Sequence, residues 1–443
     1  MSQQTCAERT PVTRAASRSR TILMAYRFGT AALLAALMAG ASWIFWSGAI
    51  ATLLGRRSPN SDAVDFTAFY TAGRLVATGA AHRLFDPAAY AVAEHSYGVP
   101  AVARDALLPF LNPPFFALLL APVARLSFSA AFQVWGAINL GALAIAVLFV
   151  WWASRRERLV LRFLLIALMI TARPVPFSLQ LGQFSLILLA AWTCTFVALV
   201  IGRDRVAGIS LAICLIKPEI VIPAVLLLAW KRRVTALSSF AVTGAMFGIV
   251  SVAMIGFVAA ARYPEYIYRV AIEHRAGTAT HIMMGWNGLF DSFLGSTHQG
   301  LETLLALPAS VLTLAAVAYA LRGRFSPHRD PAFAAQWLLV TVATILVDPH
   351  FYLQDAAIFM APACFYVLSE RGRGRARALA GLLVGWWIMA LGVIPNLTWH
   401  VALLPVYLAG VGVFLIVELE RSRRSADVSK RDEPALPALE AAA

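Results

Sequence analysis

The sequence predicts an all-α polytopic membrane protein, a bundle of about 12 transmembrane helices with an amphipathic helix in its first extracytoplasmic loop. Of the 443 residues, 60% are hydrophobic and 14% are charged, whereas soluble domains are about half apolar and about a quarter charged. Apolar runs long enough to cross a bilayer recur through most of the chain, and Lys and Arg gather in clusters between them. This composition excludes a soluble globular enzyme, a disordered protein and a soluble nucleic-acid-binding protein.

The membrane spans follow from apolar runs that approach or exceed the roughly 20 residues needed to cross the hydrocarbon. Two further segments are ambiguous, because 207–230 is interrupted at Lys217-Pro218-Glu219 and 113–126 is too short for an upright span. The remaining expected spans are 28–54, 130–152, 159–172, 184–201, 234–259, 302–321, 332–347, 353–369, 377–394 and 400–418.

The positive charges decide the orientation, since cytoplasmic loops of membrane proteins are enriched in Lys and Arg. All basic clusters fall on one side if 207–230 is a hairpin with Lys217 at its far tip and 113–126 is re-entrant or interfacial. Both termini are then cytoplasmic and the protein is a multi-pass protein of the inner (plasma) membrane. The net charge of +14 could indicate an anionic partner, but in this topology it mostly records orientation. The clusters lie at 9–27, 155–162, 203–205, 231–233, 322–329, 371–377 and 421–431.

The chain is expected to form one membrane domain between two cytoplasmic tails. We place a basic tail at 1–27, the transmembrane domain at 28–420 and a disordered tail at 421–443. The first apolar run has no cleavage site of the A-x-A kind after it, which favours a retained span over a signal peptide. The first extracytoplasmic loop, 55–129, is long for a membrane connection, and such loops usually carry function.

One segment of this loop, Val64–Ala77, has apolar residues at helical spacing and predicts an amphipathic helix lying on the bilayer surface. Asp65 falls in its first turn. It can simply complement the helix dipole, or it can be a carboxylate at the water–lipid boundary that takes a proton from a hydroxyl. Both interpretations can hold for the same residue.

Two polar positions interrupt apolar sequence and are functional candidates. Lys217 lies within a hydrophobic stretch, where a charge is expensive, and would suit a lipid-linked phosphate. Alternatively it snorkels at a helix end or pairs with Glu219. His350 lies in a very short connection between two spans and can donate to a phosphate or orient a hydroxyl; alternatively it is a solvated residue in a turn.

Other polar groups are weaker candidates. Gln183 follows a glycine and Asn112 precedes two prolines, and both patterns are typical of helix starts. Between 260 and 301, basic residues alternate with tyrosines; a solvated loop helix with an aromatic belt is favoured over a polar cleft. The residues that could line such a cleft are Arg262, Arg269, His274 and Arg275.

Seven short motifs follow one another between residues 28 and 400. In this order they resemble glycosyltransferase family 87, a family of polytopic enzymes of the GT-C class. Each motif is weak alone, and the specificity lies in the ordered set. They are Asp65-Phe66-Thr67-Ala68-Phe69-Tyr70, Leu84-Phe85-Asp86-Pro87, Asn112-Pro113-Pro114-Phe115, Leu181-Gly182-Gln183, Ile216-Lys217-Pro218, Trp286-Asn287-Gly288 and His350-Phe351-Tyr352.

The resemblance implies a GT-C-like bundle that transfers a sugar, typically mannose, from a polyprenyl-phosphate donor to a hydroxyl of a glycolipid or glycan on the extracytoplasmic side, with inversion. Asp65 then looks like the general base. Lys217 and His350 would hold the leaving phosphate, and Gln183 and Asn112 would lie near the sugar or the cleft wall. The further candidate substrate-binding residues are Tyr70, Arg74, Tyr352 and Asn287. No cofactor is implied, and because the first loop has no adjacent D-x-D pair we expect no obligatory metal.

Two other functions stay open at this point. A transporter or flippase of a lipid-linked sugar would use charged residues as an ion path, here Lys217, Glu219, Asp348 and Asp355. Transporters often have matching broken helices in two halves, however, and the break at Lys217-Pro218 has no clear counterpart. A sugar-polymer ligase, with its chemistry in the late outer segment 260–301, is a weaker alternative.

Overall fold

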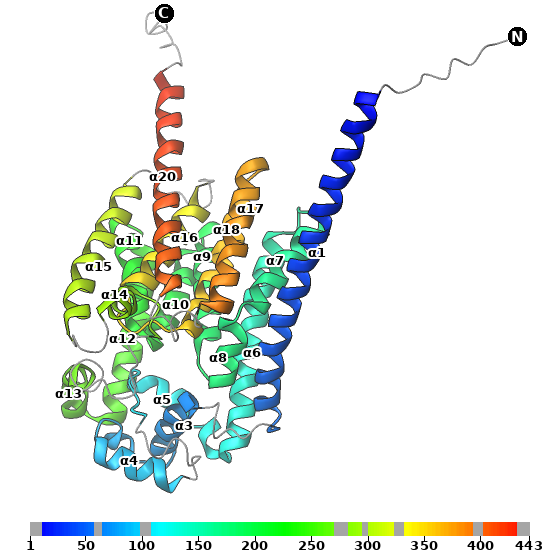
Figure 1. Cartoon of the computed structure of the whole chain (residues 1–443). Coiled ribbons are helices and arrows are strands. Elements are labelled where there is room, and N and C mark those ends of the chain that lie inside the picture. Colours follow the sequence, from blue (N-terminus) through cyan, green and yellow to red (C-terminus); the bar gives the residue numbers. More distant parts are fainter. Residues whose placement is uncertain are drawn as a thin grey trace, which may run out of the picture. The chain divides into compact units, whose positions relative to one another are not determined.

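The computed structural model describes residues 11–56, 64–97, 108–269, 282–294, 300–322, 332–392 and 402–431, and throughout these ranges the regular structure is helical (Figure 1). This confirms the all-α class. The chain forms two compact units, 1–47 and 48–443. The first contains most of helix α1, Pro11–Leu53, and the bundle and the site described below belong to the second. His274 and Arg275 lie outside the described residues.

The second unit consists of helices joined by short connections. Its α-helices are α3 (Val64–Ala77), α4 (Pro87–Ser96), α5 (Pro114–Leu120), α6 (Phe128–Ala153), α7 (Leu159–Thr171), α8 (Pro174–Leu181), α9 (Ser185–Val200), α10 (Asp204–Ile213), α11 (Ile222–Trp230), α12 (Val234–Ile255), α13 (Phe257–Ile267), α14 (Trp286–Leu294), α15 (Leu301–Ala320), α16 (Phe333–Val347), α17 (Ala357–Ser369), α18 (Gly372–Leu391) and α20 (Leu403–Arg431). Short 3₁₀ turns include η3 (Val123–Arg125), η4 (Cys214–Ile216), η5 (Pro218–Val221) and η9 (Leu353–Ala356).

Six helical segments within the described ranges are long and apolar enough to cross a membrane, which establishes a polytopic membrane protein. Four shorter apolar helices accompany them, at 185–200, 218–230, 333–347 and 353–369. The count of about 12 crossings stays a prediction. The six segments are Ala32–Leu53, Phe128–Ala153, Leu159–Leu181, Val234–Ile255, Leu301–Ala320 and Leu403–Ser425.

The shorter apolar helices α9, α16 and α17 form the core of the bundle. Phe196 of α9 stacks on Phe333 of α16 and on Phe365 of α17, with ring centroids 5.2 Å and 4.5 Å away. One helical turn further along, the ring centroids of Trp192 and Trp337 lie 5.0 Å apart. Because nearly every side chain of α16 is buried, these helices are surrounded by protein.

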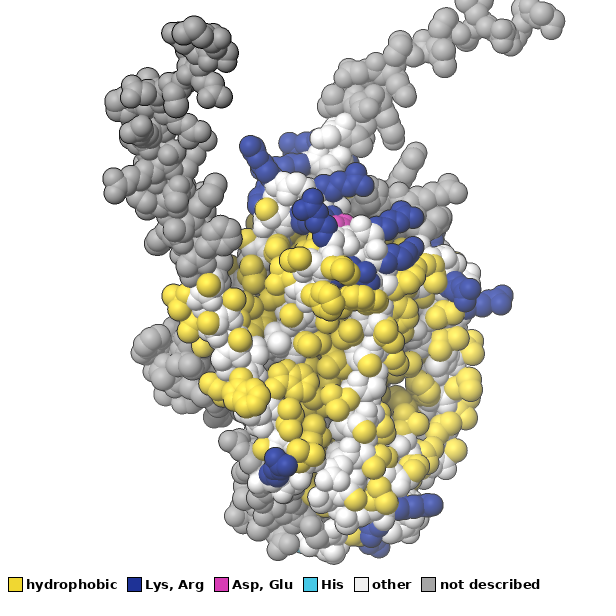
Figure 2. All heavy atoms as spheres, turned by 90° about the vertical axis from the view of Figure 1, so that its right-hand side faces the viewer, with side chains coloured by type: hydrophobic (Ala, Val, Ile, Leu, Met, Phe, Trp, Pro, Cys, Tyr) yellow, Lys and Arg dark blue, Asp and Glu magenta, His cyan; other side chains and the backbone are white. Residues whose placement is uncertain are grey.

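The basic clusters gather at one end of the bundle, beyond a wide band of apolar side chains (Figure 2). Ion pairs hold the helix ends together there, which explains how segments far apart in sequence share one charged surface. This confirms that the described basic clusters lie on one side, whereas the side of the membrane they face stays a prediction. The ion pairs are Arg233–Asp204, Arg375–Glu157 (2.6 Å), Arg322–Glu420 (2.8 Å) and Arg377–Glu418 (3.5 Å).

The two ambiguous segments have clear structures. Residues 207–230 form a helical hairpin, with α10 as its first arm and α11 as its second. The Arg233–Asp204 ion pair joins the ends of the two arms. Lys217 lies at the turn between η4 and η5, as the hairpin interpretation predicts. Residues 113–126 form only α5 and η3, packed against α3 and, for α5, also against α12.

The structure differs from expectation at two places. Helix α3 has the expected bounds, but Phe66 and Phe69 are buried, and so are Thr67 and Thr71 on its polar face. This helix therefore packs inside the protein, against α4, α5 and η3, and its placement on a bilayer surface stays a prediction. Helix α20 continues to Arg431, through the first part of the segment that we assigned to a disordered tail.

Candidate active site

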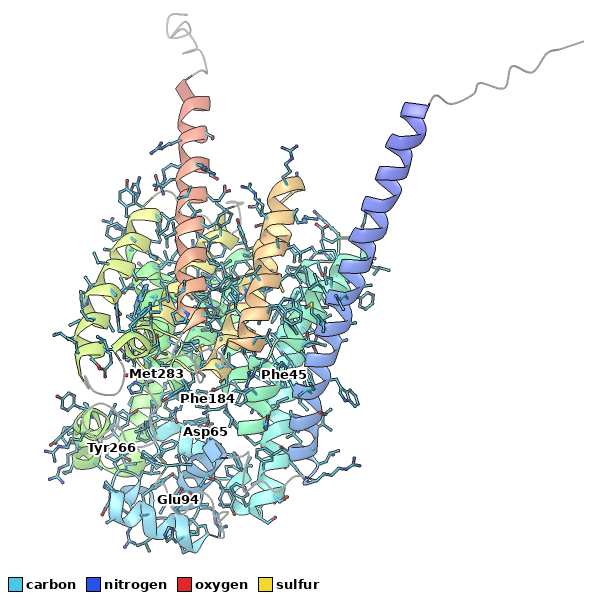
Figure 3. The ribbon with its side chains drawn as sticks, in the orientation of Figure 1. Phe45, Asp65, Glu94, Phe184, Tyr266 and Met283 are labelled. Carbon is cyan, nitrogen blue, oxygen red and sulfur yellow. The ribbon has the colours of Figure 1, made fainter. Side chains whose placement is uncertain are left out.

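The candidate site is built around Asp65, at the start of α3, and Gln183, two residues before the first residue of α9. Gln183 Nε2 donates a hydrogen bond of 2.8 Å to Asp65 Oδ2 across 118 residues of sequence. Figure 3 labels Asp65 and Phe184, the residue after Gln183, at the end of the bundle where α3, α4 and α5 lie. The Asp65 side chain is half-buried, so the sequence-predicted base and one predicted sugar-binding residue form a single polar contact.

A glycine allows this contact. Gly182 ends α8 with φ +71°, and its carbonyl accepts a 2.7 Å hydrogen bond from Trp135 Nε1. A Cβ at this position would lie 2.6 Å from Phe66 Cβ, next to Asp65. The left-handed turn therefore lets the chain reverse between α8 and α9 and brings Gln183 within reach of α3.

We expect Gly182→Ala to destabilise the protein and to lower activity by moving Gln183. The positive φ alone costs an alanine about 1–2 kcal/mol, and the contact with Phe66 adds to this. Gly79→Ala is the matched control, because Gly79 also has a positive φ (+77°) but open space around its Cβ position. Thermal unfolding should therefore show a larger loss for Gly182→Ala; equal losses would contradict the role of close packing.

Burial changes the acidity of Asp65. Burial raises its pKa from 3.8 to about 6; the Gln183 hydrogen bond lowers the value and the negative charge of Asp355 raises it. A carboxylate with a pKa near 6 is ionised at neutral pH and is a better proton acceptor than an ordinary aspartate. The electrostatic effect of Asp355 also places that residue in the surroundings of the site.

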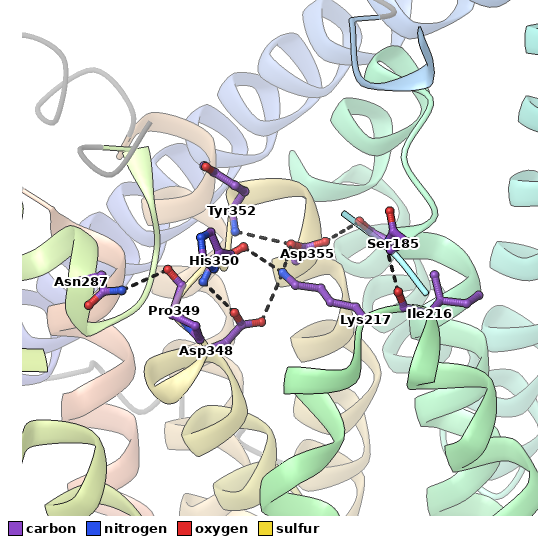
Figure 4. A network of polar contacts seen from close by, with 10 residues as sticks. Ser185, Ile216, Lys217, Asn287, Asp348, Pro349, His350, Tyr352 and Asp355 are labelled. Atoms are coloured by element: carbon purple, nitrogen blue, oxygen red, sulfur yellow. Dashed lines mark hydrogen bonds and ion pairs between the residues drawn. The ribbon is translucent and has the colours of Figure 1, made fainter. Parts of the chain in front are cut away.

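Asp355, whose charge acts on Asp65, belongs to a buried charge cluster around Lys217 (Figure 4). Lys217 Nζ lies 2.7 Å from Asp355 Oδ2 and 3.2 Å from Asp348 Oδ2, and it donates a 2.8 Å hydrogen bond to the carbonyl of His350. All three charged side chains are at most 8% exposed. Lys217 therefore makes hydrogen bonds to Asp355 and to the His350 carbonyl, and its contact with Asp348 is an ion pair.

Two residues at the start of α9 connect Asp65 to this cluster. Gln183 holds Asp65, and Ser185, two positions later, donates a 2.8 Å hydrogen bond to Asp355 Oδ1. The backbone N–H of Tyr352 also points to Asp355 Oδ2 at 3.4 Å. The start of α9 therefore fixes both carboxylates, and Tyr352 contributes through its backbone.

The two predicted asparagines bind backbone carbonyls next to the cluster. Asn112 Nδ2 donates to the carbonyl of Ile216, 2.9 Å away, and Asn287 Nδ2 donates to that of Pro349, 3.1 Å away. These acceptors immediately precede Lys217 and His350. Both asparagines thus hold the loops that carry the charged residues.

The hydrogen bonds of Tyr70 and Arg74 go to backbone carbonyls, and not to Asp65 or Asp355. Tyr70 OH donates to the carbonyl of Leu126 at 2.9 Å, and Arg74 Nη1 donates to that of Ala124 at 3.4 Å. The Arg74 guanidinium also lies over the ring of Tyr97. These contacts fasten α3 to the η3 segment, which indicates packing at both positions.

Sequence reasoning did not include Asp355 and Ser185 among the site residues. Asp355 appeared only in the alternative ion path, although an acid at the start of an apolar segment is costly and was a usable signal. Ser185 carries no such signal, because serines at helix starts are common. Within the described part of the chain, no group of three or more His, Cys, Asp or Glu is placed to hold a metal ion.

Residues 110–349 match the model of glycosyltransferase family 87, which is more than half of the chain. The chain belongs to this family. The resemblance drawn from the ordered motifs is thereby confirmed, and the protein is a membrane glycosyltransferase. No curated protein and no solved structure matches it. The matched region of the glycosyltransferase includes Gln183 and Lys217, whereas Asp65 and His350 lie outside it.

Proposed function

We propose that this glycosyltransferase moves a sugar, mannose by family resemblance, from a polyprenyl-phosphate donor to an acceptor hydroxyl on the extracytoplasmic side, with Asp65 as general base. The observation that carries the proposal is the half-buried carboxylate of Asp65, held by Gln183 and with a pKa of about 6. The acceptor is a glycolipid or a glycan.

The location of the site supports an extracytoplasmic reaction. Helix α9 begins beside Gln183 and ends before the basic pair Arg203 and Arg205. Its 16 residues separate the site from the basic end by about 24 Å. Because basic ends face the cytoplasm, Asp65 lies toward the outer side in this proposal. Cytoplasmic termini and an inner-membrane location are the matching predictions from the charge pattern of the sequence.

The proposed reaction is a single displacement. The acceptor hydroxyl transfers its proton to Asp65 while its oxygen forms a bond to the anomeric carbon of the donor sugar. The bond from that carbon to the phosphate oxygen breaks, and its electron pair leaves with polyprenyl phosphate. Attack from the face opposite the leaving group converts a β-linked donor into an α-linked product.

The charge cluster changes the role that we propose for Lys217. Its ammonium donates hydrogen bonds to Asp355 and to the His350 carbonyl and forms an ion pair with Asp348, so two buried carboxyl groups of the protein already surround it. We therefore assign Lys217 to fixing the segment 348–355, and through Asp355 and Ser185 to positioning the start of α9. His350, half-buried on that segment, remains the proposed donor to the phosphate.

The transporter alternative is not favoured by this geometry. Three of its four ion-path residues, Lys217, Asp348 and Asp355, do contact one another. They lie together, however, at the turn between η4 and η5 and in the connection 348–355 between α16 and α17, and an ion path needs polar groups along the depth of the bundle. Turnover of synthetic polyprenyl-phosphate-mannose by the purified protein in vesicles, followed by chromatography of the product, tests the two functions against each other.

The pH dependence of kcat/KM should report the ionisation of Asp65. We expect activity to rise with pH around a midpoint of about 6, because only the ionised carboxylate accepts a proton. In Gln183→Leu the hydrogen bond that lowers this pKa is lost, so the midpoint should move to higher pH. Gln133→Leu, on an exposed position of α6, is the control; an unchanged midpoint in Gln183→Leu would contradict the assignment.

A further inference from the structure

A cavity of about 360 Å³ lies between α16, α17, α18 and α20, away from the candidate active site. Its wall is almost entirely apolar and includes Leu338, Phe359, Leu382 and Phe414. This volume falls within the range of small-molecule binding pockets, about 300–1,000 Å³. The cavity is thus large enough for a flexible hydrocarbon segment.

The cavity adjoins a surface that faces hydrocarbon. Val384 of α18 and Val413 of α20, the helices that line it, are 52% and 62% exposed, and 403–425 of α20 is apolar enough to span a membrane. Large exposed apolar residues on such helices face lipid chains in a bilayer. Lipid chains are therefore the molecules with direct access to this space.

One end of the cavity is basic. Arg377, near the start of α18, lines it together with Tyr366, near the end of α17. Arg377 Nη2 lies 3.5 Å from Glu418 Oε1, and its side chain is 58% exposed. This loose, accessible pairing leaves most of the guanidinium surface open to an anion, and guanidinium groups bind phosphate in a two-pronged geometry.

Two glycines leave the space open. Gly381 and Gly410 line the cavity from α18 and α20, and a Cβ at either position would meet no atom within 4 Å. Glycine inside a helix is unfavourable unless close packing requires it, and at neither glycine does a neighbour occupy the place of a side chain. The absence of side chains at these two positions maintains the cavity.

We infer that this cavity binds one acyl chain of a phospholipid from the leaflet on the basic side, with the phosphate of its headgroup at Arg377. The cavity is distinct from the active site, because its lining includes none of Asp65, Lys217 and Asp355. Its basic end lies furthest from Asp355, at Tyr366 near the end of α17 and Arg377 near the start of α18. The inference does not depend on the identity of the sugar donor. The bound lipid fills the space between the central helices and the peripheral helices α18 and α20.

Photocrosslinking tests the inference on the full-length protein. The protein is reconstituted into phosphatidylcholine vesicles containing phosphatidylglycerol with a diazirine in one acyl chain, irradiated and mapped by mass spectrometry. The readout is a ratio of label yields. The yield in the cavity peptides, which contain Phe359, Leu382 and Phe414, is divided by the yield in the α12 peptides that contain the lipid-exposed residues Val242 and Ile249. We expect several-fold enrichment at the cavity.

Cavity-filling variants decide whether the enrichment comes from this space. Gly381→Leu and Gly410→Leu, on different helices, should each reduce cavity labelling to the α12 level. Gly141→Leu is the control, since Gly141 on α6 also has open space at its Cβ and lies outside the cavity. Arg377→Gln should lower labelling by phosphatidylglycerol several-fold, whereas Arg156→Gln, elsewhere at the basic end, should not.

The opposite results overturn the inference. Absence of enrichment in the wild type, or enrichment that survives both leucine variants in folded protein, would remove the acyl-chain site. Displacement of the label by polyprenyl phosphate but not by excess phosphatidylglycerol would assign the cavity to an isoprenoid chain instead. Unchanged labelling in Arg377→Gln would remove the headgroup contact.

Discussion

Asp65→Asn is expected to lower kcat for sugar transfer by about 10²–10⁴-fold, the usual contribution of a general base, with little change in the KM for the donor. Asparagine has nearly the same shape as aspartate, and its side-chain oxygen can still accept the hydrogen bond from Gln183. It cannot take up the proton of the acceptor hydroxyl. Initial rates of transfer from synthetic polyprenyl-phosphate-mannose, measured in vesicles, check this result.

The matched control is Asp86→Asn in the same segment of the chain, between α1 and α6. Asp86 caps α4 by accepting hydrogen bonds from the N–H groups of Ala88 and Ala89, each 3.1 Å long. Asparagine is an equally good cap, so this variant should retain near wild-type activity. Equal activity of Asp65→Asn and the wild type, with both variants folded, would remove Asp65 from the mechanism.

Lys217→Met is expected to lower the free energy of unfolding by about 3–5 kcal/mol, the usual loss when one partner of a buried ion pair is removed. The variant leaves Asp348 and Asp355 buried side by side without their common cation. Adding Asp355→Asn should restore part of the lost stability, because one of the two unpaired charges is then gone. Thermal unfolding of the single and double variants measures the effect.

An exposed ion pair provides the comparison for Lys217. Arg269 and Glu265 form a pair in which both side chains are more than half exposed, so Arg269→Met should change the unfolding free energy by less than about 1 kcal/mol. If Lys217 instead binds the donor phosphate directly, Lys217→Met would stay as stable as Arg269→Met and would raise the KM for the donor. That pattern would contradict the positioning role.

Local sequence pattern was sufficient for much of the fold. The apolar runs and the placement of Lys and Arg predicted a polytopic helical bundle with its charges at one end, and helical spacing gave α3 its bounds, Val64–Ala77. The Lys217-Pro218 break predicted the turn between η4 and η5. These features depend on residues close together in the chain, which is why periodicity and charge reveal them.

The partners of the polar groups could not be predicted in the same way. Lys217 contacts Asp355 across 138 residues, and an isolated lysine in apolar sequence has the same appearance whether it binds a phosphate or two carboxylates. Tyr70 and Arg74 were predicted to bind substrate, and their hydrogen bonds go to the η3 segment. Helical periodicity identifies the face of a helix and does not identify what packs against it.

The central claim is tested most directly by the products of the wild-type enzyme supplied with β-linked polyprenyl-phosphate-mannose and a hydroxyl acceptor. The proposed mechanism predicts one polyprenyl phosphate released for each sugar transferred, and an α-linkage in the product as determined by NMR. Retention of the β-linkage would contradict the single displacement. Movement of intact polyprenyl-phosphate-mannose across the vesicle membrane without transfer would contradict the proposed function.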